Sequence, residues 1–290
     1  MPRRELSNRL MVAVVGIPVT AFIIYWGVWP LAILMAAAGA LGAREYYSLT
    51  PDGTLAFAWL GATLAGALPL IAAIYSDYRA FAPWALALIL GTALLALALS
   101  LWLRWPDGRP MAAASRTIMG ALYTGGMLSF WVLLRALPEQ VSNGATAFHG
   151  AALLIFPIWV TWVGDTFAYS FGSRWGEARL IEAVSPHKTV VGAIAGLLGS
   201  VLAGGVFARL WLGGVPEFAL SWPVAAAVSL PIAMIGQVGD LAESVIKRDA
   251  GMKDSSDLLP GHGGVLDRLD ALFFTVPFTY ALLLQIRPWL

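Results

Sequence analysis

Apolar runs of about 20 residues recur from one end of the chain to the other, and they restrict the fold more than any other feature. A helix of that length crosses a hydrocarbon core about 30 Å thick. Charged residues make up 12% of the 290 residues, whereas soluble domains carry about 25%. The sequence therefore predicts an all-α integral membrane protein.

Nine runs are predicted to be transmembrane helices, near residues 10–28, 30–47, 56–75, 83–103, 114–136, 150–172, 190–211, 223–246 and 268–287. Arg3, Arg4 and Arg9 precede the first run, as in a signal peptide. That run is too long for a signal peptide and no small-residue cleavage site follows, so it is interpreted as a membrane anchor. We expect an N-terminal transmembrane region over 1–150 and a C-terminal catalytic transmembrane region over 151–290.

Basic residues set the predicted orientation. With a cytoplasmic N-terminus, one side of the membrane receives fourteen of the 18 lysines and arginines, namely Arg3, Arg4, Arg9, Arg44, Arg104, Arg109, Arg116, Arg174, Arg179, Lys188, Lys247, Arg248, Lys253 and Arg268. The positive-inside rule then predicts a cytoplasmic N-terminus and an external C-terminus, with the polar segments 173–189 and 247–267 in the cytoplasm.

A net charge of +1 argues against a nucleic-acid partner, and the absence of cysteine excludes disulfides and thiolate chemistry.

The eighth run ends in a polar face. Asp240, Glu243, Ser244 and Lys247 follow Gly236 at spacings that place all five on one side of a helix. A carboxylate in the middle of a span costs about 2.5–3.5 kcal/mol, so function is one explanation for it. The alternative is a helix end that reaches the interface, with an internal Glu243–Lys247 pair. That alternative leaves Asp240 unexplained.

A glycine-rich loop follows this helix. Gly261, Gly263 and Gly264 permit close approach of the backbone to a ligand, and His262 is a potential donor to phosphate. Asp267 and Asp270 come three residues apart at the start of the ninth run. An ordinary connector, followed by first-turn acids that favour the helix dipole, is the alternative reading.

Two more groups are candidates for a site. Asp165 lies in the sixth run on a face with Tyr169, where an ionisable residue indicates function unless it only forms a structural hydrogen bond. In the segment 185–189, Lys188 is suited to phosphate, and Thr189 is suited to capping the seventh helix.

The stretch 244–270 resembles the signature of phosphatidate cytidylyltransferases, also called CDP-diacylglycerol synthases. The matching residues are Ser244, Lys247, Arg248, Lys253, Asp254, His262, Gly263, Gly264, Asp267, Arg268 and Asp270. The chain also resembles the family at a second motif, which is formed here by Asp165, Ala168, Tyr169, Gly172 and Gly176. A third resembles 185–192, with two departures: His187 stands where the family has lysine, and Val191 stands where it has glutamate.

The resemblance implies a membrane enzyme that makes CDP-diacylglycerol and pyrophosphate from CTP and phosphatidic acid. It implies Mg²⁺ as cofactor, with K⁺ as a possible second cation, and a location in the cell inner membrane with the site facing the cytoplasm. The lipid bilayer is an expected partner, and a homodimer is one oligomeric state left open.

The same resemblance assigns roles to residues of this chain. The residues assigned to catalysis are Asp240, Lys247, Arg248, Lys253, Asp254, Asp267 and Arg268. The residues assigned to substrate binding are Asp165, Tyr169, Ser185, Lys188, Ser244, His262, Gly263 and Gly264. The implied metal ligands are Asp240, Asp267 and Asp270.

Three other functions are alternatives. A secondary transporter would use intramembrane Asp165 and Asp240, but it leaves the polar stretch 244–270 unexplained. A related CTP-dependent enzyme, such as a polyprenol kinase or an archaeal-lipid cytidylyltransferase, would share much of the chemistry. An inactive scaffold derived from the enzyme is the third, and it is motivated by Val191.

Overall fold

The computed structural model describes residues 3–49, 57–256, 258 and 263–289, with side chains from residue 14 onward. The chain forms two compact units, and each unit is built from two separate stretches of sequence. The first comprises Met1–Leu133 and Asp249–Leu269, and the second comprises Leu134–Arg248 and Asp270–Leu290. The polar stretch 244–270 is therefore divided between the units.

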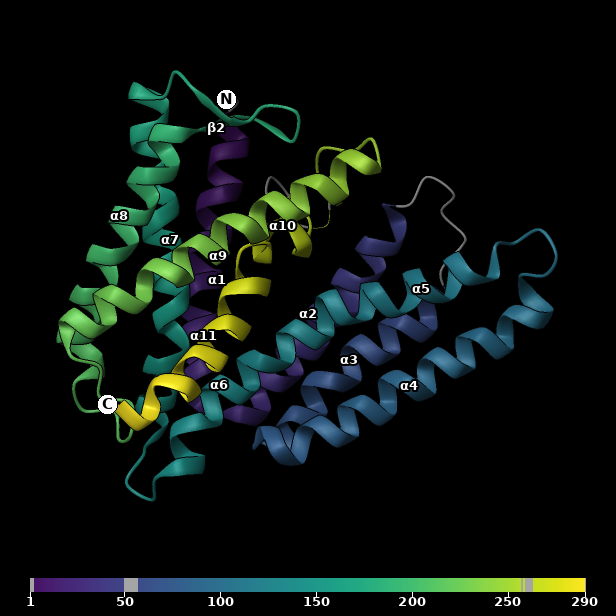
Figure 1. Cartoon of the computed structure of the whole chain (residues 1–290), viewed down its shortest axis with the longest axis horizontal. Coiled ribbons are helices and arrows are strands. Elements are labelled where there is room, and N and C mark those ends of the chain that lie inside the picture. Colours follow the sequence, from purple (N-terminus) through teal and green to yellow (C-terminus); the bar gives the residue numbers. More distant parts are fainter. Residues whose placement is uncertain (1–2, 50–56, 257, 259–262, 290) are drawn as a thin grey trace. The chain divides into compact units, whose positions relative to one another are not determined.

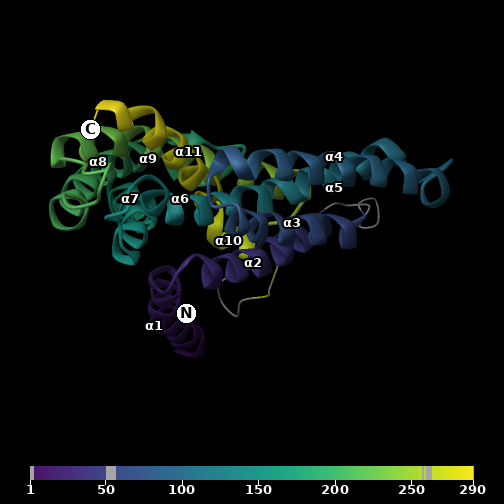
Figure 2. The ribbon, with the colours of Figure 1, turned by 90° about the horizontal axis from the view of Figure 1, so that it is seen from below.

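The first unit is helical. Its elements are α1 (Arg3–Trp26), α2 (Val28–Ser48), α3 (Ala58–Ile74), α4 (Tyr78–Leu103), α5 (Pro110–Ala121), the π-helical turn η1 (Leu122–Gly126), the start of α6 (Met127–Val141) and the short α10 (Val265–Leu269). Figures 1 and 2 both show α3, α4 and α5 running side by side.

Buried polar bonds join the helices of this unit. The hydroxyl of Tyr47 on α2 donates to the carbonyl of Thr117 on α5 at 2.7 Å, and Thr117 Oγ1 accepts from the backbone N–H of Phe57 at 2.8 Å. Polar groups buried among apolar helices need such partners, because water is excluded there. These bonds hold the polar end of α2 next to α5.

The second unit carries the remaining elements. They are the rest of α6, then α7 (Ala147–Trp175), β1 (Arg179–Ile181), β2 (Ser185–Thr189), α8 (Val190–Phe207), the π-helical turn η2 (Ala208–Leu212), α9 (Trp222–Asp249), α11 (Leu272–Ile286) and the 3-10 turn η3 (Arg287–Trp289). Helices α7 and α8 lie side by side (Figure 1). They approach closely because glycines face each other: a Cβ on Gly192 would lie 2.8 Å from the carbonyl oxygen of Ala168.

The predicted helical architecture is confirmed in outline. Six helical segments of the described residues are long and apolar enough to cross a membrane: Tyr78–Leu103, Pro110–Val141, Ala147–Trp175, Val190–Leu212, Trp222–Asp249 and Val265–Trp289. Val14–Trp26 and Ala58–Ile74 are shorter apolar helices. The count of nine spans and the orientation of the termini stay predictions.

Two details differ from the predicted spans. The last span was expected to be continuous from about residue 268, but the helix is interrupted between Leu269, where α10 ends, and Leu272, where α11 begins. The polar segment 173–189 was not predicted to contain strands, but β1 and β2 within it form an antiparallel hairpin in which Arg179 pairs with Thr189. Strands this short carry too few residues to show an alternating pattern in the sequence.

Candidate active site

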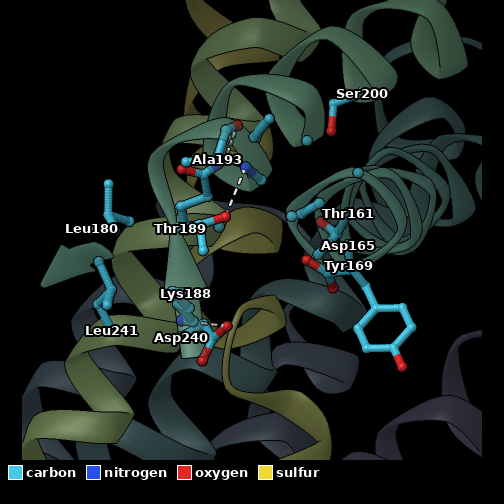
Figure 3. A pocket seen from close by; sticks show the side chains of 18 of the residues that line it. Thr161, Asp165, Tyr169, Leu180, Lys188, Thr189, Ala193, Ser200, Asp240 and Leu241 are labelled. Atoms are coloured by element: carbon cyan, nitrogen blue, oxygen red, sulfur yellow. Dashed lines mark hydrogen bonds and ion pairs between the residues drawn. The ribbon is translucent and has the colours of Figure 1, made fainter. Parts of the chain in front are cut away.

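The second unit contains a cavity of about 360 Å³ between α7, the hairpin, α8 and α9. Its polar lining residues are Thr161, Asp165, Tyr169, Ser173, His187, Lys188, Thr189, Ser200, Gln237 and Asp240. Figure 3 shows Asp165 of α7, Lys188 of β2 and Asp240 of α9 around the same space, although these elements are separate in the sequence. A concave space with a few convergent polar groups is the usual form of a small-molecule site.

An ion pair lies in the wall of this cavity. Lys188 Nζ on β2 is 2.6 Å from Asp240 Oδ2 on α9 (Figure 3). The two side chains are 26% and 37% exposed, so the pair remains accessible from the cavity. The backbone next to Lys188 is fixed, because Thr189 Oγ1 caps α8 by accepting from the N–H of Gly192 at 3.1 Å. The predicted cap at Thr189 is thus confirmed.

Asp165 on α7 adds a second carboxylate to the same cavity. It interacts electrostatically with Asp240, Asp270 and Lys188. Among the described residues no hydrogen bond joins it to Tyr169, whose ring is 78% exposed and points away from the ion pair (Figure 3). A structural hydrogen bond to Tyr169 is therefore not the explanation for Asp165, and its functional role stays a prediction.

Gln237 also lines the cavity, and it was not predicted as a site residue. Its Nε2 donates to the carbonyl of Ala193 at 2.9 Å, which orients the amide between α8 and α9. The signal was present in the sequence, because Gln237 is a polar residue within an apolar run one turn before Asp240.

The end of α9 carries a second charged cluster. Lys247 Nζ is 3.3 Å from Glu243 Oε1, and Glu243 is 1% exposed. Asp270 also bonds to Glu243. The internal Glu243–Lys247 pair considered as an alternative is thus present, whereas Asp240 pairs with Lys188 on another element. Arg248 Nε contacts the carbonyl of Val184 in the hairpin at 3.4 Å.

The remaining predicted site residues lie outside the cavity. Ser185 and Ser244 are half-buried on β2 and α9. Lys253, Asp254 and Arg268 belong to the first unit and are exposed. His262 lies outside the described residues.

Asp267, another of the three predicted metal ligands, accepts hydrogen bonds from described residues before α10 in the first unit. Its Oδ2 accepts from Ser255 N at 2.9 Å, from Ser255 Oγ at 2.8 Å and from Gly264 N at 2.8 Å. Gly263 beside it has φ +75°, a conformation that favours glycine. A carboxylate fixed by several donors is typical of an oriented ligand group.

The glycines of this loop were expected to approach a ligand, but Gly264 approaches protein groups. A Cβ at Gly264 would lie 2.5 Å from Glu45 Oε2 and would clash with Ser255 Oγ. Glu45, at the end of α2, was missed as a functional candidate. Like Asp165, it is an acid near the end of an apolar run, and the same reasoning would have identified it.

The described residues contain no group of three or more histidine, aspartate or glutamate side chains arranged to hold a metal ion. The donor chemistry nevertheless fits a hard cation, because Asp165 and Asp240 present carboxylates to one cavity. The implied ligands Asp240, Asp267 and Asp270 stay predictions.

The fold and the cavity together define a class: a multi-pass helical membrane protein with an accessible site that combines carboxylates and a lysine. The chain matches the cytidylyltransferase family over residues 7–286, and it belongs to that family. The predicted family and the prediction of an enzyme are confirmed.

Relatives across nearly the whole chain carry a more specific name. A phosphatidate cytidylyltransferase of Synechocystis sp. is 31% identical, with 97% of this chain and 98% of that protein covered. One of Bacillus subtilis is 26% identical, with 96% and 98% covered. A chloroplastic phosphatidate cytidylyltransferase of Arabidopsis thaliana is 30% identical, with 92% of this chain and 69% of that protein covered.

Proposed function

We propose that this chain is a phosphatidate cytidylyltransferase, which makes CDP-diacylglycerol and pyrophosphate from CTP and phosphatidic acid. The observation that carries the proposal is the Lys188–Asp240 pair in a cavity shared with Asp165. Family membership narrows the chemistry to transfer of a cytidylyl group. The relatives named above are the reason for choosing phosphatidate as the acceptor.

In the proposed reaction an oxygen of the phosphatidate phosphate attacks the α-phosphorus of CTP. A new P–O bond forms, the bond to the β-phosphate breaks, and pyrophosphate leaves with the electron pair. Attacking and leaving groups are both anionic, so the protein has to position them and neutralise charge. Phosphatidate is already ionised, so no strong general base is needed.

Lys188 is the cation best placed for this task within the cavity. Its ammonium group exchanges Asp240 for a phosphate oxygen when the substrate enters, and three donors allow it to contact more than one oxygen. Asp240 holds the ammonium in place beforehand, and the cap at Thr189 fixes the backbone that carries it.

Mg²⁺ is proposed as the cofactor, with Asp240 and Asp165 as the cavity's candidate ligands and Asp267 and Asp270 as further ligands by family resemblance. When bound, the ion would neutralise phosphate charge. A second, monovalent cation such as K⁺ stays a proposal from resemblance alone.

The test is turnover of purified protein in detergent with labelled CTP, Mg²⁺ and phosphatidic acid. Parallel reactions contain a polyprenol or an archaeal-type ether-lipid phosphate as acceptor. Formation of labelled CDP-diacylglycerol and pyrophosphate with phosphatidic acid supports the proposal. Release of CDP with a polyprenol would indicate a polyprenol kinase instead. Transfer only to the ether lipid would indicate an archaeal-lipid cytidylyltransferase. No transfer to any acceptor would favour the inactive scaffold.

The proposed location is the cell inner membrane with the site on the cytoplasmic side. Leu258 is a suitable reporter, because it lies in the loop between α9 and α10 and is 50% exposed. Ser256 is a poorer choice, since its hydroxyl donates to Glu45. The native chain has no cysteine, so Leu258→Cys introduces a single thiol.

In intact cells we expect Leu258→Cys to resist a membrane-impermeant thiol reagent, and to react once the membrane is opened. The positive-inside rule is the physical reason, because the basic residues of this loop favour the cytoplasm. Labelling from outside in intact cells would reverse the orientation and remove the loop's access to cytoplasmic CTP.

The departure at Val191 gives a second prediction. Val191 lies in the first turn of α8, is 37% exposed and is not part of the cavity lining. We expect Val191→Glu to change turnover by no more than about twofold, because an acid in a first helical turn is tolerated and this position does not face the cavity. The measurement is kcat in detergent, with Val190→Glu as the neighbouring control. A several-fold gain specific to Val191→Glu would show that the usual glutamate takes part in the reaction.

A further inference from the structure

Glu45 is a buried acid that the proposed mechanism does not use. It lies at the end of α2 and is 7% exposed. A carboxylate in such a place is costly unless its oxygens have donors. The donors come from Ser256, before α10, and from Val265 and Leu266, at its start, although these residues are more than 200 positions away in the sequence.

Both carboxylate oxygens of Glu45 are engaged. Oε1 accepts from Ser256 Oγ at 2.7 Å and from Val265 N at 3.0 Å. Oε2 accepts from Leu266 N at 3.0 Å and also lies 3.4 Å from Ser255 Oγ, which donates its proton to Asp267. Three donors therefore bond to the carboxylate, and each of its oxygens has at least one. Glu45 is therefore suited to holding the loop and not to binding a metal or accepting a proton.

The geometry of the loop fits this carboxylate closely. Val265 and Leu266 begin α10, whose first N–H groups have no partner within the helix. Glu45 satisfies two of them from outside. Gly264 leaves the space that the carboxylate occupies, since a Cβ there would lie 2.5 Å from Oε2.

The same contacts reach Asp267. Ser255 Oγ donates its single proton to Asp267 Oδ2 at 2.8 Å and lies 3.4 Å from Glu45 Oε2. The backbone N–H groups of Ser255 and Gly264 also donate to Asp267 Oδ2, and each is next in sequence to a residue that bonds to Glu45, namely Ser256 and Val265. Glu45 thus fixes the two segments of backbone that in turn fix the Asp267 carboxylate. Displacing a group by about 1 Å from its productive position can cost about 100-fold in rate.

We propose that Glu45 is a positioning residue for the reaction. From α2 it clamps Ser256, Val265 and Leu266, and through the adjacent backbone of Ser255 and Gly264 it sets the orientation of Asp267. The proposal rests on the proposed function, since Asp267 is there assigned to the phosphate chemistry. It gives the end of α2 a role in positioning Asp267.

The key variant is Glu45→Gln, which keeps the size of the side chain but presents an amide NH₂ where two of the donors point. We expect kcat to fall about 100-fold, with a smaller change in KM for CTP, because positioning of the reacting groups is affected more than binding. Glu217→Gln is the matched control, since Glu217 only pairs with Arg287 at an exposed position. It is expected to keep normal turnover.

A second readout does not depend on activity. Leu266 is fully buried, so Leu266→Cys should react slowly with a thiol reagent in the otherwise native chain. In the Glu45→Gln background we expect the labelling rate to rise about tenfold or more, because the loop and α10 open more often. In the Glu217→Gln background the rate should stay low. Ser256→Ala, which removes one donor, should shift both readouts in the same direction but less.

The outcomes are distinct. Normal turnover of Glu45→Gln overturns the proposal. So does a loss of turnover with unchanged labelling of Leu266→Cys, because Glu45 would then act on the chemistry directly. If Glu45→Gln does not fold, Ser256→Ala decides in its place, and normal values in both readouts contradict the clamp. If the native chain itself transfers no cytidylyl group, the proposed function fails, while the labelling still tests the clamp.

Discussion

Replacing Asp240 with asparagine is expected to reduce CDP-diacylglycerol formation about a thousandfold, the loss typical of removing a key electrostatic group from a catalytic site. Asp240 holds Lys188 at 2.6 Å, and it is the cavity carboxylate that family resemblance assigns to the metal. The asparagine amide has the same size but no charge, so it can neither form the ion pair with Lys188 nor bind a metal ion as an anionic ligand. The measurement is kcat at ordinary and at raised Mg²⁺ concentrations.

Two further variants show which role of Asp240 matters. Asp107→Asn, at an exposed position before α5, is the control for the loss of a carboxylate and should leave turnover normal. Lys188→Met removes the other half of the pair and should lower turnover by about 100-fold. If the pair acted only as a unit, Asp240→Asn combined with Lys188→Met would be no worse than the poorer single variant. Near-normal turnover of Asp240→Asn at ordinary Mg²⁺ would remove Asp240 from the reaction.

The sequence predicted well whatever depends on local pattern. Runs of apolar residues identified the helices, because every backbone group in a membrane has to be paired within the segment. Acids within those runs identified Asp165 and Asp240, because an ionisable group in a membrane is expensive without a purpose. The structure then brought these two residues and Lys188 to one cavity.

What could not be predicted depends on contacts between distant segments. The polar stretch 244–270 reads as one motif, but its residues divide between two compact units at Arg248 and at Leu269. Nothing in a local pattern shows that Glu45 accepts hydrogen bonds from Ser256, Val265 and Leu266, because the donors are backbone N–H groups and a serine hydroxyl, which occur throughout the chain. The glycine at position 264 likewise indicated that another group lies close to the backbone. The sequence did not show that the Glu45 carboxylate is such a group.

The loss expected for Asp267→Asn is comparable with that for Asp240→Asn, about a thousandfold in kcat if it carries metal or phosphate chemistry. The hydrogen bonds of Asp267 show what this substitution leaves in place. Asp267 Oδ2 accepts three hydrogen bonds from Ser255 and Gly264, and an asparagine can keep these only with its oxygen in that position, which turns its NH₂ group to where the other oxygen was. The substitution therefore removes a charge while the loop retains its partner.

Ser255→Ala tests how much the orientation of the Asp267 carboxylate matters, because it leaves the charge of Asp267 unchanged. It removes the hydroxyl donor at 2.8 Å but leaves the backbone donors of Ser255 and Gly264 in place. We expect about a tenfold loss of kcat, within the range for changes around an oriented ligand.

Asp270→Asn should also lower kcat less than Asp267→Asn, because Asp270 precedes α11 and accepts a hydrogen bond from the N–H of Ala271. Near-normal turnover of Asp267→Asn at ordinary Mg²⁺ would show that Asp267 serves the structure of the loop and not the reaction.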